Sequence, residues 1–140
     1  MAMSKPLKKA EYETLAAFRL ALRRFVHFSG RAAESAGITG QQYQALLAIK
    51  GFPGRKSVSV GELADQLQLR HHSAVELVDR MVEEKLVVRT PSAADRRWVL
   101  VQLSGRGERI LETLASMHRE QLKRIGPDIR QLLERVGGAE

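Results

Sequence analysis

The fold is decided by residues 59–104, which read SVGELADQLQLRHHSAVELVDRMVEEKLVVRTPSAADRRWVLVQLS. Ser59 and Glu62 form a capping-box pair that predicts the start of a short helix. After a turn at residues 68–70, a second helical pattern runs from His71 to about Lys85. Two helices joined by a turn of three or four residues form a helix-turn-helix unit.

A β-hairpin is predicted directly after these two helices. Residues 86–89 and 98–103 are rich in β-branched and apolar side chains, which favours strands. The intervening residues 90–95 have the composition of a turn. Asp95, Arg96 and Arg97 lie at the tip, and Asp95 is placed to pair with Arg97 and fix its direction. The hairpin, called the wing below, therefore lies beside the helix-turn-helix unit.

Helical patterns flank this segment on both sides. A long helix is expected over residues 7–34, and Thr39 with Gln42 predicts a capping box at the start of the next one. Ser104 is expected to cap a further long helix, which we expect Gly126-Pro127 to break before a short last helix. The predicted fold is mainly α with a small β-hairpin.

Composition narrows the function. The 140 residues include 23 Lys and Arg, 16 Asp and Glu and no cysteine, which leaves a formal net charge of +7. The excess of positive charge points toward a polyanion, either nucleic acid or an anionic membrane surface. Without cysteine there is no disulfide framework, thiolate metal site or thiol redox sensor. The length predicts a single domain over 1–140, and the absence of an apolar leader or span predicts a cytoplasmic protein without membrane contact.

The tips of the helix-turn-helix unit and of the wing supply the candidate DNA contacts. The second helix begins with basic and polar side chains, where the helix dipole also favours phosphate. An arginine at the wing tip suits the negative potential of a narrow minor groove. The predicted DNA-binding residues are Arg70, His71, His72, Ser73, Glu76, Arg80, Arg96 and Arg97, with Asp95 as support for the wing tip.

Several of these residues have a plainer interpretation. His71 and His72 suggest a metal, but neighbours on a helix point about 100° apart and no third ligand is near in sequence. No metal and no cofactor are therefore predicted. Arg80 lies nearly three turns into its helix, so bracing the helix or meeting a phosphate is favoured over reading a base. Asp79 is a candidate partner for a basic group within the domain.

Three short patterns together resemble the MarR family of winged helix-turn-helix regulators. They are Gly61-Glu62-Leu63-Ala64, then the helix pattern over residues 74–81, then Asp95-x-Arg97-x3-Val101-x-Leu103-Ser104-x2-Gly107. The wing pattern is the most specific of the three. Relative to the family, the second helix begins with Arg70, His71 and His72 instead of small hydroxyl residues, and position 76 is Glu instead of basic or polar.

The resemblance implies a homodimer that reads a near-palindromic operator. Residues 36–104 correspond to the DNA-binding lobe, and residues 7–35 and 105–137 to dimerisation helices. The recognition helix is expected over about 71–85 in the major groove, with the wing at the minor groove. Many members are repressors released by small aromatic or anionic compounds, and a repressor is expected here. Phe25, Phe28, Tyr43 and His118 are candidate effector contacts, with core or dimer packing as the plainer interpretation.

Two other functions stay open at this point. An enzyme is not expected, because paired catalytic carboxylates, a metal-binding His motif, a phosphate-binding glycine loop and a nucleophile elbow are all missing from the sequence. A winged-helix module that binds DNA without sequence preference, or that binds protein, has the same fold and stays the alternative. Sequence discrimination between duplexes distinguishes it from a specific regulator.

Overall fold

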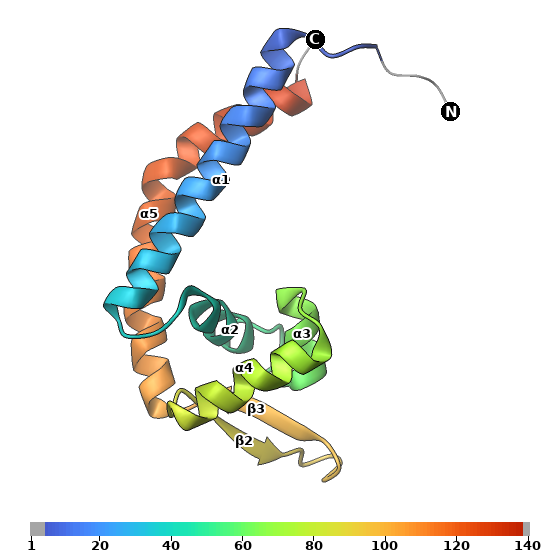
Figure 1. The fold of residues 1–140 in the computed structure, drawn as a ribbon, viewed down its shortest axis with the longest axis vertical. Coiled ribbons are helices and arrows are strands. Elements are labelled where there is room, and N and C mark those ends of the chain that lie inside the picture. The colour runs from blue at the N-terminus through green and yellow to red at the C-terminus, as the bar shows by residue number, and fades with distance from the viewer. Residues whose placement is uncertain (1–4, 139–140) are drawn as a thin grey trace. The chain divides into compact units, whose positions relative to one another are not determined.

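The computed structural model describes residues 5–138, which form helices and one small antiparallel sheet (Figure 1). In chain order the elements are α1 (Lys9–Ser35), α2 (Gly40–Lys50), β1 (Ser57–Ser59), α3 (Val60–Leu67), α4 (His71–Glu83), β2 (Val87–Pro91), β3 (Val99–Leu103) and α5 (Gly105–Gly138). The predicted class, mainly α with a small β element, is confirmed.

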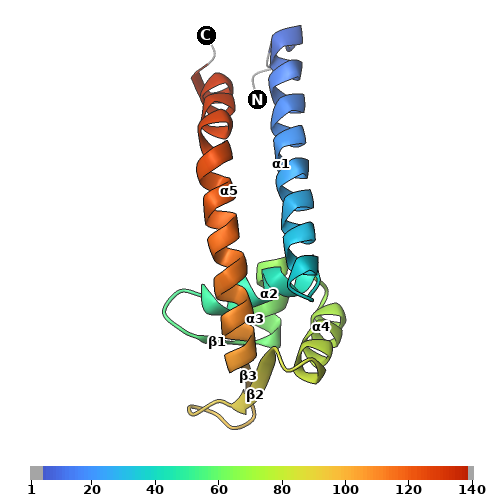
Figure 2. The same cartoon turned by 90° about the vertical axis from the view of Figure 1, so that its left-hand side faces the viewer.

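The chain divides into two compact units. Unit 1 contains the first part of the chain up to Ser29 together with the part from His118 onward, and unit 2 contains Gly30–Met117. The helix-turn-helix pattern and the wing both lie in unit 2. Most of α1 and the second half of α5 lie in unit 1, where the two helices run side by side (Figure 2).

The capping boxes predicted for unit 2 are present. Thr39 Oγ1 accepts from the Gln42 N–H at 3.0 Å, and the Gln42 side chain accepts from the Thr39 N–H. Ser59 and Glu62 form the same pair of hydrogen bonds at the start of α3. These bonds satisfy N–H groups that have no partner within the helix, which fixes where each helix begins.

The turn of the helix-turn-helix unit depends on Gln68. This residue ends α3 in the left-handed conformation, with φ of 55°. The Leu69 N–H then donates to the Ala64 carbonyl at 2.9 Å, which closes the end of α3. The chain reverses within residues 68–70, so α3 and α4 pack closely as a helix pair.

The sheet has one strand more than the sequence predicted. The strand order is β1-β3-β2, so β3 lies between the hairpin partner β2 and the short β1. Val58 pairs with Val101, and Arg89 pairs with Val101 from the other side. Val58 and Val101 are buried, which makes β1 part of the core although it is only three residues long.

Gly107 allows the start of α5 to pack against the end of α4. The Leu86 carbonyl oxygen lies 2.1 Å from where a Cβ at Gly107 would be, which no real side chain tolerates. Ser104 Oγ accepts from the Gly107 N–H at 3.0 Å and donates to the Lys85 carbonyl at 2.6 Å, as the predicted cap requires. The glycine of the wing pattern therefore joins α5 to the hairpin.

The predicted break at Gly126-Pro127 is wrong, because α5 continues through Pro127 to Gly138. Proline in a helix removes one N–H donor and crowds the carbonyl four residues earlier, at a cost of about 3 kcal/mol. A continuous helix keeps Ile125, Ile129 and Leu132 on one half-buried stripe, which offsets that cost. Within residues 5–138, no helix is both long and apolar enough to cross a membrane.

Candidate nucleic-acid interface

The start of α4 is basic and exposed. Arg70, His71 and His72 are all exposed, and Ser73 is half-buried behind them. Arg70 occupies the cap position of α4 without a capping hydrogen bond from its side chain. In contrast to α2 and α3, this helix therefore begins with no side-chain cap over its first N–H groups, where the helix dipole concentrates positive charge.

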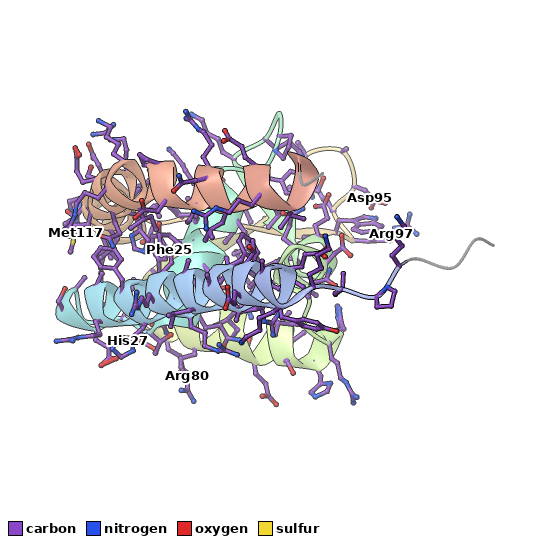
Figure 3. All side chains as sticks on the ribbon, turned by 90° about the horizontal axis from the view of Figure 1, so that it is seen from above. Phe25, His27, Arg80, Asp95, Arg97 and Met117 are labelled. Atoms are coloured by element: carbon purple, nitrogen blue, oxygen red, sulfur yellow. The ribbon has the colours of Figure 1, made fainter. Side chains whose placement is uncertain are left out.

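The outward face of α4 follows this basic start. Glu76 and Arg80 are exposed one and two turns further along, and Figure 3 shows the Arg80 side chain extended away from the helix. Asp79 forms an ion pair with Arg89 of β2, which confirms the prediction that it meets a basic group within the domain. This pair ties the wing to α4, and Arg89 was predicted only as a strand residue.

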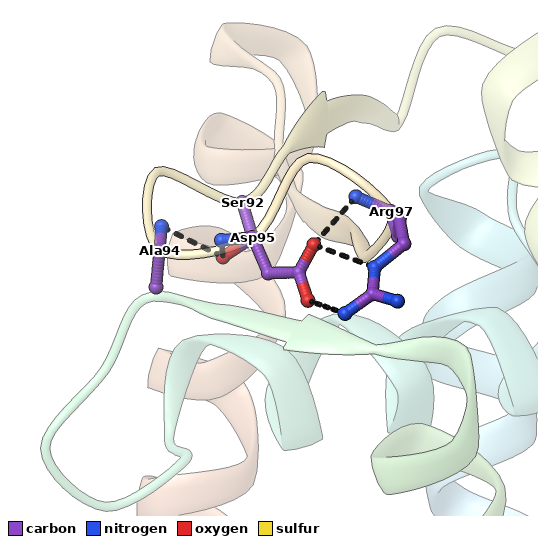
Figure 4. Close-up of polar contacts among 4 residues, drawn as sticks. All are labelled: Ser92, Ala94, Asp95 and Arg97. Carbon is purple, nitrogen blue, oxygen red and sulfur yellow. Dashed lines mark hydrogen bonds and ion pairs between the residues drawn. The ribbon is translucent and has the colours of Figure 1, made fainter.

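The wing tip is held by a clamp between Asp95 and Arg97 (Figure 4). Arg97 donates from its backbone N–H and from Nε to Asp95 Oδ1 at 3.0 and 3.1 Å, and from Nη2 to Oδ2 at 2.9 Å. Ser92 Oγ accepts from the N–H groups of Ala94 and Asp95 on the other side of the turn. The predicted Asp95–Arg97 pair is therefore present, with bidentate geometry.

The clamp leaves the arginine accessible. The Arg97 side chain is 88% exposed and that of Asp95 is 33% exposed. Hydrogen bonds from Arg97 hold the pKa of the Asp95 carboxyl below its usual range, and the same bonds raise the pKa of the guanidinium. Arg96, next to the clamp, is also exposed. Two cations thus project from a turn of defined shape.

The basic start of α4 and the wing tip lie at one side of unit 2. In Figure 1 the beginning of α4 and the turn between β2 and β3 both point to the same side. Figure 2 shows that α4 and the turn between β2 and β3 extend in different directions. Unit 2 thus carries two separate basic projections, the start of α4 and the wing tip.

The candidate effector residues divide between the two units. Phe25, Phe28 and His118 form an aromatic cluster in unit 1, with ring centroids 5.4 to 6.5 Å apart. His118 is buried, and its Nε2 lies 2.8 Å from Ser29 Oγ. Tyr43 lies in unit 2, where it is 4% exposed and burial raises the pKa of its hydroxyl.

A cavity in unit 1 has a different lining. It has a volume of about 650 Å³ and lies between the start of α1 and the end of α5. Its lining includes Leu7, Leu15 and Val136, together with the charged Glu134 and Arg135. None of the four candidate effector residues contributes to this lining. Across residues 5–138, no group of three or more His, Asp and Glu side chains is arranged to hold a metal ion.

The sequence model of the MarR family matches residues 36–97, which contain α2, the sheet edge β1, the α3–α4 pair and the wing turn. Residues 36–97 belong to the MarR family. The match ends at Arg97, the arginine of the Asp95 clamp. The resemblance is therefore confirmed over residues 36–97, which contain the first two patterns and the start of the wing pattern at Asp95 and Arg97.

Two relatives match part of this chain. The chain is 35% identical over 66 residues to YsmB of Bacillus subtilis, described as an uncharacterised HTH-type transcriptional regulator; the match covers 47% of this chain and 45% of YsmB. It is 34% identical over 91 residues to BadR, a transcriptional activatory protein of Rhodopseudomonas palustris, covering 64% of this chain and 52% of BadR. The chain thus spans about half the length of these relatives.

Solved structures support the fold beyond the matched segment. AbsC, a MarR family transcriptional regulator from Streptomyces coelicolor, superposes with a TM-score of 0.74 at 20% identity, over 90% of this chain and 84% of AbsC. A variant of MepR from Staphylococcus aureus bound to an oligodeoxyribonucleotide gives 0.65 at 20% identity, over 80% of each chain. The flanking helices are therefore part of the shared fold.

Two features of the interface were missed from sequence. Arg89 was read only as a strand residue, although its partner Asp79 was expected to meet a basic group. Arg55 ion-pairs with Glu62 and lies 4.6 Å over the Phe52 ring, which fixes the loop before β1. The Arg55 bond is the largest cause of the lowered pKa of Glu62. The two members of each pair lie on different elements and follow no local sequence pattern, so only the folded structure shows that they meet.

Proposed function

We propose that this chain is a sequence-specific, DNA-binding transcriptional regulator and not an enzyme. The observation that carries the proposal is the wing tip, where Asp95 holds the guanidinium of Arg97 in place while leaving it 88% exposed. Ordering a flexible arginine at an exposed turn has a cost in side-chain entropy, which contact with an anion repays. A narrow minor groove supplies such a site.

In this proposal α4 is the recognition helix. Its exposed start, Arg70 to His72, meets phosphates and base edges in the major groove, and Ser73 adds a hydroxyl behind them. Arg80 reaches the flanking backbone, and Arg96 and Arg97 reach the next minor groove. The structural similarity to a MepR variant with bound oligodeoxyribonucleotide and the regulator descriptions of YsmB and BadR support this assignment.

The proposed assembly is a homodimer built by the helices of unit 1. Large apolar side chains are exposed along both helices there, and a second copy is the partner that covers them in a two-fold arrangement. They are Leu7, Tyr12, Leu15, Leu20, Leu22 and Val26 on or before α1, and Leu122, Leu133 and Val136 on α5. Two wings and two recognition helices then read a near-palindromic operator.

Repression is the proposed direction of regulation, by occupancy of an operator that overlaps a promoter. BadR is described as an activatory protein, so activation is the other possible direction. A transcription assay with the selected operator placed before or across the promoter distinguishes the two.

The proposed effector class is a small aromatic or anionic compound that contacts Phe25, Phe28 and His118. Tyr43 belongs to the same candidate set.

Selection of bound duplexes from a random pool tests the proposal. We expect one enriched, near-palindromic site that binds at least ~10³ more tightly than random DNA. Arg97→Ala should weaken binding and lower the slope of log K against log salt by about one phosphate per subunit, since each contact contributes about 0.9. Arg130→Ala, which removes an equal charge from exposed α5, is the control and should bind normally.

Two results would count against the proposal. Equal affinity for all duplexes would favour the alternative, a winged-helix module that binds DNA without sequence preference. Normal binding by Arg97→Ala would remove the wing from the interface.

A further inference from the structure

The outward face of α4 is more acidic than a DNA-reading helix requires. Beyond its basic start it carries three carboxylates on exposed positions, Glu76, Asp79 and Glu83. Carboxylates repel the phosphates that line both edges of the major groove, so each of them lowers affinity for DNA in general. A carboxylate on this face therefore has to be neutralised by a cation or to accept a hydrogen bond, if α4 is to bind DNA.

The three carboxylates differ in their partners and in their positions along α4. Asp79 is held by Arg89 of the wing, so its charge is neutralised within the domain. Glu83 is the last residue of α4, far from the end that leads into the groove. Glu76 lies in the second turn, and among residues 5–138 no hydrogen bond or ion pair involves its side chain.

The position of Glu76 is that of a base-reading residue. It is six residues after the cap residue Arg70, on the same face as His72 one turn before and Arg80 one turn after. In a recognition helix that enters the major groove with its N-terminal part, the first two turns lie closest to the base edges. Glu76 thus lies between His72 and the cation Arg80 and presents an acceptor between them.

We infer that Glu76 is a specificity-determining residue that selects cytosine in each half-site. This inference rests on the proposed DNA binding by α4. A carboxylate only accepts hydrogen bonds, and the major groove offers amino donors at cytosine N4 and adenine N6. The adenine amino group stands beside the acceptor N7, which repels a carboxylate, whereas cytosine has no acceptor on the corresponding side. Guanine and thymine present only acceptors as their polar groups, so they are excluded.

Selection by Glu76 works largely by exclusion. A cytosine amino group partly offsets the loss of hydration of the carboxylate when the groove closes over it. Guanine and thymine leave that charge without a donor, and adenine offers its donor only beside the repelling N7, while the phosphates repel the carboxylate in each case. The same residue therefore lowers binding to random DNA and raises the ratio of specific to random affinity, which is how specificity gains from a repulsive element.

The test compares three full-length proteins in the same selection from random duplexes: the natural chain, Glu76→Gln and Glu83→Gln. For the natural chain we expect a cytosine at one fixed position of each half-site, where replacement of the pair weakens binding by roughly 5- to 150-fold, the usual range for one mismatch. Glu76→Gln should reduce that penalty to less than about 3-fold and shift preference toward adenine, which glutamine binds through N6 and N7.

Glu83→Gln removes the same charge from the same helix and should keep the cytosine preference. Thermal unfolding of both variants should match the natural chain, since both positions are exposed. If Glu76→Gln keeps the same preference at every position, the role of Glu76 is overturned while DNA binding stands. If the natural chain enriches no site at all, the proposed function itself fails, and the selection by Glu76 fails with it.

Discussion

The two units differ in where they keep their apolar side chains. In the described part of the chain, every buried hydrophobic residue lies in unit 2, from Ala32 to Leu114. The buried residues of unit 1 are Ser29 and His118, both polar. Its large apolar side chains are instead exposed, with Val26 the most exposed at 63%.

This contrast shows that the two units depend on different sources of stability. Unit 2 closes a core between α2, α3, α4 and the sheet, so its apolar side chains are buried within one chain. Two long helices whose apolar stripe is only half-buried gain less from their own packing than a closed core does, because most helical stability in proteins comes from a buried face. In the proposed dimer, a second copy would bury on unit 1 the same kind of surface that unit 2 buries within one chain.

The largest expected effect comes from breaking the self-sufficient core of unit 2. Gly107→Ala places a Cβ 2.1 Å from the Leu86 carbonyl oxygen, where the backbone must shift. Overpacking of this kind costs about 1–3 kcal/mol, and the clash is with backbone, so we expect a loss of about 3 kcal/mol in the free energy of unfolding. Denaturant unfolding followed by circular dichroism measures it.

Gly105→Ala is the matched control in the same helical turn. A Cβ there would lie 3.4 Å from Nη1 of Arg109, the far end of a flexible side chain. Because alanine favours a helix over glycine by up to about 1 kcal/mol, this variant should be neutral or slightly more stable. Equal stability of the two variants would show that the close approach of α5 to Leu86 does not hold in solution.

The second prediction concerns the exposed apolar face of unit 1. Val26→Glu places a charge on the face that the proposed dimer buries, twice per dimer. An unpaired buried charge costs several kcal/mol, so the dimer dissociation constant should rise at least ~100-fold. Sedimentation velocity should then show a species of 15.7 kDa in place of one about twice that mass.

Ala17→Glu provides the control on the same helix. Ala17 is exposed and lies nine residues, or two and a half turns, before Val26, so it points to the opposite side of α1. This variant should dimerise within about 3-fold of the natural chain. A natural chain that sediments as a monomer at micromolar concentration would remove the assembly, and the palindromic operator with it.

Local signals in the sequence predicted unit 2 well. The capping boxes at Thr39 and Ser59 and the cap at Ser104 depend on residues three positions apart, so pattern alone locates them. The clamp between Asp95 and Arg97 is equally local. The Arg89–Asp79 pair was only half foreseen, because its two members are on different elements that meet only in the fold.

The errors have a common physical cause. Pro127 carries a strong local signal for a helix end, yet α5 continues because the apolar stripe around it stays on one face. β1 is only three residues long and shows no alternating pattern of its own, so its pairing with β3 was not visible. In both cases tertiary packing outweighs the local preference. For the candidate DNA contacts, the sequence indicated which residues are basic and exposed, but their roles stay predictions.

The smallest expected effect is confined to the wing tip, residues 92–98, which protrudes from unit 2 and contributes no side chain to its buried core. Arg97 lowers the pKa of the Asp95 carboxyl in the folded protein, so the clamp is intact above the ordinary carboxyl range and is lost as the pH falls through the lowered value. NMR titration of the Asp95 carboxyl carbon should give a pKa below that of an unpaired aspartate. In Arg97→Ala the pKa of Asp95 should rise toward the usual range, because the side-chain hydrogen bonds, which are the largest cause of the shift, are lost while the backbone N–H remains a donor.

The same titration should leave the rest of unit 2 unchanged. Asp95 and Arg97 are joined within one turn, and their ion pair reaches none of the buried residues of the core. Loss of the clamp at low pH should therefore broaden signals of residues 92–98 without a change in circular dichroism. An unshifted pKa of Asp95 in the natural chain would show that the clamp is open in free protein, and that the direction of Arg97 is set only when DNA binds.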